Sequence, residues 1–457
     1  MTSVRDLVSG LPHGRAFALA WPMIVANVSV PLVGLVDTAM LGHFSDTVNL
    51  GAVAAGSIVL SAAYWVLAFL RLGTTSLVGR SIGAGRPLDT VSHLQRSLLL
   101  AGVLAAGVLL IQWVALPLLM AVMAPAGEVR ELATAYSQIR FHSLPAVLGT
   151  FVVTGYFIGS QDTRRPLAIA VTVNVLNLVL DVAFVGGLGW GAAGAAWATM
   201  IAEWVGLALA AVLLWRFLDP ELKARLRRWR GQGLRRGWRA LLTMNADLAV
   251  RTVLLYVALT FLTAAGGRIS PDVLAANAIL MQVTLLASYG LDGYAHAAEA
   301  MSARAIGTRN LTELHRANLA ATLPAIVIAA AFTAVFVLGQ DQFIALMTDL
   351  PGLTQTTAQY YHWAAWLPLI SVAAYLLDGI FIGTGQSRIM RNCMLIAVVG
   401  IYLPSFLIPA WIAGEATNDG LWLSFTLLNI ARGVLLGIAY GRLTRSGGWL
   451  STAHAHP

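Results

Sequence analysis

Two carboxylates, Asp37 and Asp181, each come at the end of an apolar run of the sequence. Asp37 follows AFALAWPMIVANVSVPLVGLV (16–36), and Asp181 ends NVLNLVLD (174–181). A charged side chain inside a bilayer costs roughly 2.5–3.5 kcal/mol on insertion scales, so by default it marks a functional site. The chemistry that such carboxylates offer is the reversible binding of a cation, either H⁺ or Na⁺.

Further polar side chains are expected at the depth of these carboxylates. At a rise of 1.5 Å per residue, Asp181 lies about 24 Å along a helix that starts after Arg165, and Asp37 reaches a similar level. Asn174 and Asn177 share a helix face with Asp181 because their spacing is i, i+3 and i+7. Thr199 and Glu203 belong to the next apolar segment. We therefore predict a cation site formed by Asp37, Asn177, Asp181 and Thr199, with Asn27, Pro31, Asn174 and Glu203 in supporting or cavity positions.

Two facing carboxylates cannot both stay ionised cheaply where the dielectric constant is low, so one is expected to take up a proton near physiological pH. That is the requirement of a proton-coupled carrier, although the same oxygens could coordinate Na⁺. Pro31 cannot donate a hydrogen bond to the carbonyl of Asn27, so the first helix should bend or loosen shortly before Asp37. The simpler alternative is that the polar side chains only bond helices to one another.

The composition is that of a membrane protein. The 457 residues are 58% hydrophobic and 11% charged, whereas soluble domains carry about a quarter charged residues. About 20 apolar residues cross a bilayer. The fold class is thus an all-α polytopic membrane protein with an uncleaved first span. Twelve transmembrane helices are predicted, at 16–41, 52–78, 94–120, 132–160, 166–187, 192–216, 240–265, 274–303, 317–339, 358–384, 389–412 and 420–443.

Arginines flank alternate loops, and most acidic loop residues lie in the others. The densest basic stretch is WRFLDPELKARLRRWRGQGLRRGWR (215–239). By the positive-inside rule, this stretch and both termini are cytoplasmic. The stretch is predicted to face lipid headgroups, with a regulatory binding site as the alternative. The predicted domains are an N-terminal lobe (1–215), a basic linker (216–239) and a C-terminal lobe (240–457).

Two motifs recur at one constant offset. GRSIGAGRPLD (79–89) resembles ARAIGTRNLTE (303–313), and GYFIGSQDTRR (155–165) resembles GIFIGTGQSRI (379–389). The offset is 224 residues in both cases, 307 − 83 and 383 − 159. We predict a duplicated six-helix unit, and hence two pseudo-symmetric lobes that enter the membrane from the same side.

The second half carries its own polar set, near the cytoplasmic ends of the eighth and tenth segments. Asp292, His296 and Glu299 occur in LDGYAHAAEA (291–300), and Asp378 occurs in LLDGIFIG (376–383). With Arg432, near the middle of the twelfth segment, these residues are interpreted either as an inner gate or helix-end salt-bridge network, or as a second titrating site.

Arginines within the apolar segments need anions. For Arg432 the candidate partners are Asp378 and Asp292. Asp247 and Arg251 lie at i and i+4 of the seventh segment, and this spacing predicts that they pair with each other.

The sequence lacks the signatures of several other classes. There is no HExxH motif, and His296 with Glu299 lacks the second histidine of a zinc site. No GxxxxGK[ST] loop occurs, and the single cysteine, Cys393, excludes an intramolecular disulfide and a cysteine-based metal site. The net charge of +8 gathers on one set of loops, which does not fit a nucleic-acid partner. We therefore expect no enzyme and no cofactor, only H⁺ or Na⁺ as coupling ion.

Several of these segments together resemble the multidrug and toxic compound extrusion (MATE) family. The resemblance rests on AWPMIVANVSVPLVGLVDTAMLGH (20–43), FLRLGTTSLVGRSIGAGR (69–86), NVLNLVLDVAFV (174–185) and GAAGAAWATMIAEW (191–204), while LDGYAHAAEA and YLLDGIFIG (375–383) point to the bacterial DinF branch. It implies cation-coupled efflux of amphipathic, often cationic compounds through two lobes around a central cavity. It also implies a cation site at Asp37, Asn177, Asp181 and Thr199, and a first helix that bends at its proline on protonation.

The resulting prediction is a monomeric multidrug antiporter of the bacterial inner membrane, acting on drugs or dyes by alternating access. Binding of H⁺ to Asp37 and Asp181 bends the first span and expels the substrate. Coupling to Na⁺ is one alternative. A flippase for lipid-linked precursors is another, and it would need a large cavity lined with basic residues; a membrane-embedded enzyme is the third.

Overall fold

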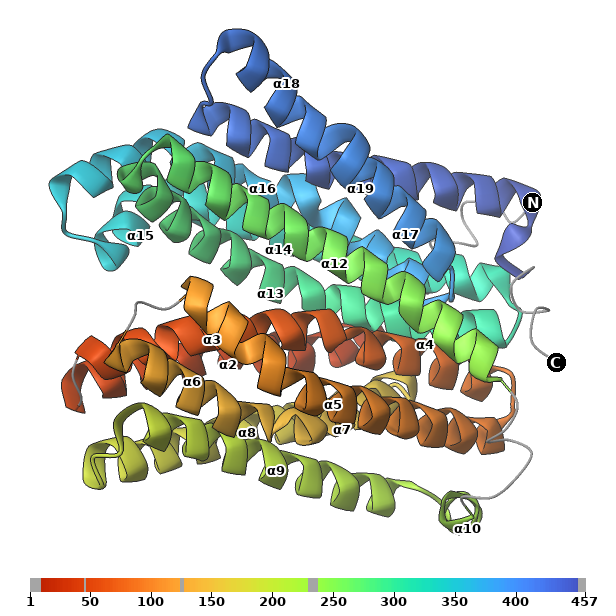
Figure 1. Ribbon diagram of the computed structural model, residues 1–457. Helices are drawn as coiled ribbons and strands as arrows, with labels where there is room; N and C mark the ends of the chain where they lie inside the picture. Colours follow the sequence, from red (N-terminus) through yellow and green to blue (C-terminus); the bar gives the residue numbers. More distant parts are fainter. Residues whose placement is uncertain (1–9, 45–46, 124–126, 229–236, 451–457) are drawn as a thin grey trace. The chain divides into compact units, whose positions relative to one another are not determined.

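The computed structural model describes residues 10–44, 47–123, 127–228 and 237–450, apart from the side chains of residues 30–44, 122, 123 and 413. All regular secondary structure in these ranges is helical (Figure 1). The all-α class predicted from the sequence is therefore confirmed.

The helices of the first half lie between His13 and Arg227. They are α2 (His13–Phe44), α3 (Thr47–Leu67), α4 (Phe69–Gly83), α5 (Pro87–Met123), α6 (Glu128–Phe141), α7 (Leu144–Gly159), α8 (Arg164–Asp181), the π-helical turn η1 (Val182–Gly187), α9 (Gly191–Phe217) and α10 (Pro220–Arg227).

The helices of the second half lie between Trp238 and Ser446. They are α12 (Trp238–Ile269), α13 (Pro271–Gly307), α14 (Leu311–Leu338), α15 (Gln340–Met347), α16 (Pro351–Gly383), α17 (Ser387–Leu395), the π-helical turn η2 (Ile396–Tyr402), α18 (Leu403–Ala413) and α19 (Asn418–Ser446).

Ten helical stretches within the described residues are long and apolar enough to cross a membrane. One of them joins α3 and α4 (Thr47–Gly83), and another joins α17, η2 and α18 (Ser387–Ile412). α6 and α7 make an eleventh crossing as a pair that is bent by 44°. With α2, which is 32 residues long, these account for the twelve predicted spans.

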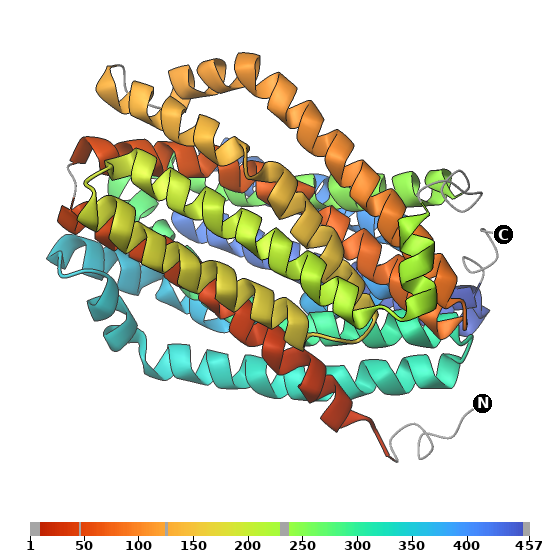
Figure 2. The same cartoon turned by 90° about the horizontal axis from the view of Figure 1, so that it is seen from below.

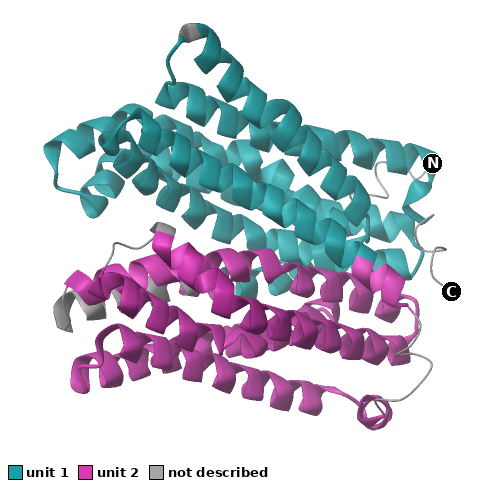
Figure 3. Ribbon diagram, viewed as in Figure 1, with its two compact units in different colours: residues 1–24, 243–457 teal, residues 25–242 magenta. Residues whose placement is uncertain are grey.

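The chain divides into two compact units (Figure 3). Unit 2 comprises residues 25–242, and unit 1 comprises residues 1–24 together with 243–457. The division falls inside α2, so the first three turns of this helix belong to unit 1 and the remainder to unit 2. The predicted lobe boundaries at 215 and 240 stay predictions.

The sequence repeat is also a repeat of helix packing. A Cβ atom on Gly155 of α7 would meet the carbonyl oxygen of Arg71 of α4, and one on Gly379 of α16 would meet that of Ala295 of α13. The next glycines along each helix do the same: Gly159 approaches Thr75, and Gly383 approaches Glu299. Each of the second-half residues named here lies 224 positions after its first-half counterpart. The same close helix crossing is therefore built twice.

The turns that follow these helices repeat as well. Gly85 (φ +70°) and Arg309 (φ +58°) occupy equivalent left-handed positions, as do Gln161 (φ +61°) and Gly385 (φ +75°). In each turn the next backbone N–H bonds back to a carbonyl of the helix, as from Arg86 to Ser81. Glycine suits this conformation, but here one member of each pair is not glycine.

Candidate cation site

α8 and α9 bring Asn177 and Thr199 together inside unit 2. Asn177 Nδ2 donates a hydrogen bond of 3.0 Å to Thr199 Oγ1, and the Thr199 hydroxyl donates to the carbonyl of Ala195 at 2.9 Å. Asn177 is only 1% exposed. Two of the four residues predicted for the cation site are therefore in contact.

Asp181 is the last residue of α8, and its side chain is fully buried, at 0% exposed. It lies one turn beyond Asn177, on the same helix face. The chain then passes directly into η1, and π-helical turns of this kind occur frequently at functional sites. The α-helical part of this span therefore ends at Asp181.

Asn174 connects this face to α2. Its Nδ2 donates a hydrogen bond of 2.6 Å to Ser29 Oγ, and the Ser29 hydroxyl donates to the carbonyl of Ala26 at 2.7 Å. Sequence analysis did not include Ser29, although a hydroxyl just before Pro31 in an apolar run was an available signal.

Three further predicted residues lie on α2. Asn27 is half-buried. Asp37 and Pro31 fall in the part of α2 whose side chains lie outside the described residues. Their places in the cation site stay predictions.

Glu203 follows Thr199 by one turn of α9, and it forms an ion pair with Arg140 of α6. Glu203 Oε2 lies 3.2 Å from Arg140 Nη1, and the two side chains are only 15% and 9% exposed. The guanidinium also lies over the ring of Tyr64, 5.8 Å from its centre. Sequence analysis missed Arg140, yet an arginine inside the fourth apolar segment required an anion nearby.

The ion pair lies beside the bend between α6 and α7. At the bend, Tyr64 Oη makes a hydrogen bond of 3.0 Å with Ser143 Oγ, and it donates to the Arg140 carbonyl at 3.4 Å. Trp204 Nε1 of α9 donates to the carbonyl of His142 at 3.2 Å. The side chain of Trp204 thus satisfies a backbone carbonyl at the break, and Tyr64 adds a further bond from α3.

A second buried charge cluster lies in unit 1. Asp378 Oδ2 of α16 accepts hydrogen bonds from Arg251 of α12 and from Arg432 of α19, the latter at 2.5 Å. Arg432 Nη1 also donates to Asn429 Oδ1 at 3.2 Å, and its guanidinium lies 6.0 Å from the centre of the Tyr375 ring. Of the two partners considered for Arg432, the contact is with Asp378.

The expected pair of Asp247 and Arg251 is wrong. Asp247 Oδ1 accepts a hydrogen bond of 2.6 Å from Arg391, and its Oδ2 accepts one of 3.0 Å from Ser387, while Arg251 bonds to Asp378. Spacing along one helix does not reveal the partners that α16 and α17 supply.

The remaining polar residues of the second half lie on α13. His296 Nδ1 lies 3.3 Å from Glu299 Oε2. Asp292 is half-buried. The inner gate and the second titrating site both stay predictions.

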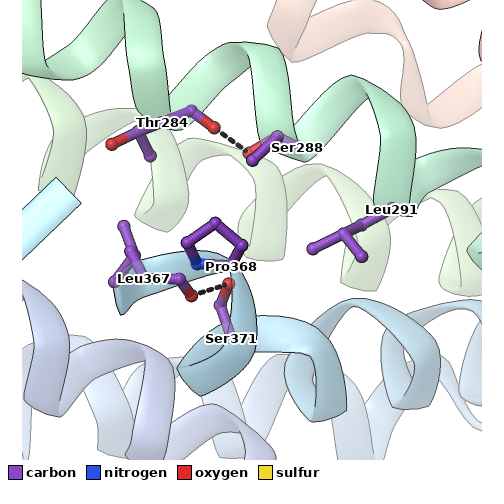
Figure 4. Close-up of a pocket in the computed structure, with 7 residues that line it drawn as sticks. Thr284, Ser288, Leu291, Leu367, Pro368 and Ser371 are labelled. Carbon is purple, nitrogen blue, oxygen red and sulfur yellow. Dashed lines mark hydrogen bonds between the residues drawn. The ribbon is translucent and has the colours of Figure 1, made fainter. Parts of the chain in front are cut away.

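A small cavity lies between α13 and α16 of unit 1 (Figure 4). Its volume of about 10 Å³ has room for roughly one water molecule, whereas pockets for drug-sized ligands measure about 300–1,000 Å³. Two of its hydroxyls are engaged by their own helices, because Ser288 donates to the carbonyl of Thr284 and Ser371 to that of Leu367. This cavity is too small for a drug.

The sequence matches a known family over most of its length. The MatE family model matches residues 22–183 and 248–406. The chain belongs to the MatE family. The DNA damage-inducible protein F of Escherichia coli (strain K12) is 36% identical over 437 residues, which are 95% of this chain and 93% of that protein.

Solved MATE structures share the fold. MATE in the straight conformation matches with a TM-score of 0.85 at 22% identity, covering 98% of this chain and 99% of that one. MATE in the bent conformation matches with a TM-score of 0.84 at 21% identity, covering 99% of each chain. This MatE protein is accordingly a multi-pass membrane transporter rather than an enzyme, with the twelve-helix fold of its family.

Proposed function

We propose that this MatE protein exports amphipathic, often cationic compounds by alternating access, and that H⁺ is the coupling ion. The observation that carries the proposal is the buried polar face of α8, where Asn177 bonds to Thr199 and Asp181 is fully buried. A buried carboxylate beside amide and hydroxyl oxygens suits a small cation, and Asp37 is assigned as the second carboxylate.

α2 is the element through which a bound cation would act. Ser29 ties α2 to Asn174 of α8 just before Pro31, so a bend at Pro31 would move the segment that follows this tie and carries Asp37. Neutralising Asp37 removes the cost of a charge in the membrane and thereby changes the preferred shape of that segment. The straight and bent conformations described for MATE relatives support this step.

The number of carboxylates supports H⁺ as the coupling ion. Two carboxylates with little solvent around them favour sharing a proton, whereas a dehydrated Na⁺ requires more oxygen ligands at defined distances. The competing candidate is Na⁺ at the same residues. In either case the transporter lies in a bacterial inner membrane with both termini in the cytoplasm, as the arginine distribution predicts.

The arginines inside the membrane-spanning helices do not support a flippase for lipid-linked precursors. Arg251 and Arg432 share the carboxylate of Asp378, and Arg140 is paired with Glu203. Arginines that already bond to internal carboxylates are less available to a pyrophosphate group than arginines that line an open cavity.

The decisive experiment is dye efflux from proteoliposomes under an imposed pH gradient or an imposed Na⁺ gradient. We expect transport by the native protein to follow the pH gradient, and Asp37→Asn and Asp181→Asn to abolish that dependence. Asp341→Asn, on exposed α15, is the matched control and should behave as the native protein does. Normal transport by Asp37→Asn under both gradients would disprove the cation site.

A further inference from the structure

Two cationic side chains of α10 converge on one indole ring. Lys223 Nζ lies 5.6 Å from the centre of the Trp215 ring, and the Arg227 guanidinium lies 4.9 Å from it. The two residues are spaced i, i+4 and are therefore neighbours on the helix surface. Like charges at this spacing repel each other and destabilise a helix.

No ion pair within the described ranges relieves this repulsion. None of the ion pairs found among the described residues includes Lys223 or Arg227. The nearest carboxylates in the sequence, Asp219 and Glu221, are both exposed at the start of α10. A pair of cations gathered over a ring, with no ion-pair partner in the part of the chain that the structure describes, is suited to an external anion.

The position of α10 indicates where that anion comes from. Figures 1 and 2 show α10 lying across the direction of α9, close to the end of α9. Trp215 stands in the last turn of α9, the membrane-spanning stretch Gly191–Phe217, and tryptophan at the end of a span marks the level of the lipid headgroups. α10 is thus an interfacial helix rather than part of a distant loop.

α10 is also fixed in place. Gln95 Nε2 of α5 donates a hydrogen bond of 3.1 Å to the carbonyl of Leu226, and Arg225 Nη2 donates one of 3.5 Å to Ser92 Oγ. These contacts hold the helix against the start of α5. These bonds therefore fix the part of α10 that carries Lys223 and Arg227.

We propose that Lys223, Arg227 and Trp215 form a binding site for the phosphate of an anionic phospholipid. The phosphate oxygens accept charge-assisted hydrogen bonds from both cations and remove their mutual repulsion. The indole ring packs against the glycerol and the first methylene groups, which a soluble phosphate lacks. The site is independent of the transported substrate and of the coupling ion.

The test uses the full protein reconstituted in nanodiscs of phosphatidylcholine with about one phosphatidylglycerol in four lipids. Lipids retained by the protein are counted by native mass spectrometry. We expect the native protein to retain phosphatidylglycerol over phosphatidylcholine, and Lys223→Gln/Arg227→Gln to lose this preference by about fivefold for each charge removed. The matched control, Arg442→Gln/Arg445→Gln, removes two exposed charges from the end of α19 and should keep the preference.

Three outcomes would overturn the proposal. The native protein could retain both lipids equally, or the control could lose the preference as far as the test variant does, which would indicate a diffuse charge effect. Competition by glycerol 1-phosphate at the concentration of the lipid would indicate a site for soluble anions. Unchanged thermal unfolding of both double variants would show that the measured difference concerns binding and not folding.

Discussion

Glu203, which forms an ion pair with Arg140 of α6, lies one helical turn from Thr199, so α9 carries both one member of this pair and part of the candidate cation site. The pair also lies beside the 44° bend between α6 and α7. Ionic contacts and helix geometry in this half of the molecule therefore depend on the same short stretch of α9.

Arg140→Gln should destabilise the protein strongly. Removing one partner of a buried pair leaves the other charge uncompensated, at a cost of about 3–5 kcal/mol. The double variant Arg140→Gln/Glu203→Gln should lose less than the sum of the two single variants, which thermal unfolding in detergent would measure as a coupling energy.

Arg86→Gln provides the control for that cycle. Arg86 pairs with Asp89 at 3.6 Å, and both side chains are largely exposed, so the change should cost less than about 1 kcal/mol. Additive effects of the Arg140 and Glu203 changes would show that the two side chains do not interact in the folded protein.

The repeated helix crossings make a second prediction, which concerns glycine. Gly383→Ala and Gly159→Ala should each destabilise the protein by roughly 1–3 kcal/mol, because the added Cβ meets a backbone carbonyl that cannot move aside. Gly102→Ala in α5 should instead stabilise by up to about 1 kcal/mol, because nothing lies within 4 Å of its added Cβ.

An equal change in stability for these three alanine variants would contradict the close helix crossing. The measurement is again thermal unfolding, and the sign of the change distinguishes the sites. Because Gly159 and Gly383 occupy equivalent positions, their effects should also be similar in size.

The sequence predicted the spans and the repeat because both depend on local pattern. Apolar length sets the number of crossings, and the glycines of the two motifs face backbone at equivalent crossings. The bend between α6 and α7 was missed, since residues 132–160 read as one continuous apolar segment and the groups that satisfy the break, Tyr64 and Trp204, come from other helices.

The partner of a buried charge was predictable only where the sequence offered few residues of opposite charge for it. Arg432 required an anion, and Asp378 was one of two candidates. Asp247 and Arg251 share a helix at favourable spacing, but each finds a partner on another helix. Pairing between helices depends on packing, which spacing along one helix does not contain.

A third prediction concerns Asp378. Asp378→Asn should cost more than about 3 kcal/mol, because Arg251 and Arg432 both lose their carboxylate partner in the interior of unit 1. Asp247→Asn should cost about 1 kcal/mol or less, because its partner Arg391 is 34% exposed and can turn to solvent. Thermal unfolding of the two variants tests this prediction. A larger loss of stability for Asp247→Asn than for Asp378→Asn would contradict it.

The last prediction addresses the candidate cation site without removing a charge. Thr199→Val keeps the shape of the side chain but removes the oxygen that accepts the hydrogen bond from Asn177. One buried hydrogen bond is worth about 0.5–1.5 kcal/mol, so the concentration of coupling cation needed for half-maximal transport should rise by up to about tenfold. Thr199→Ser keeps the hydroxyl and should restore the native value.

Thr263→Val in α12 is the control for Thr199→Val, because the Thr263 hydroxyl bonds only to its own helix at Leu259 and its side chain is exposed. Proteoliposome transport measured across a series of pH values and Na⁺ concentrations gives the half-maximal points. If Thr199→Val and Thr263→Val shift these points equally, the hydroxyl of Thr199 has no part in cation binding. A shift confined to Thr199→Val and reversed by serine would instead tie the Asn177 contact to the coupling step.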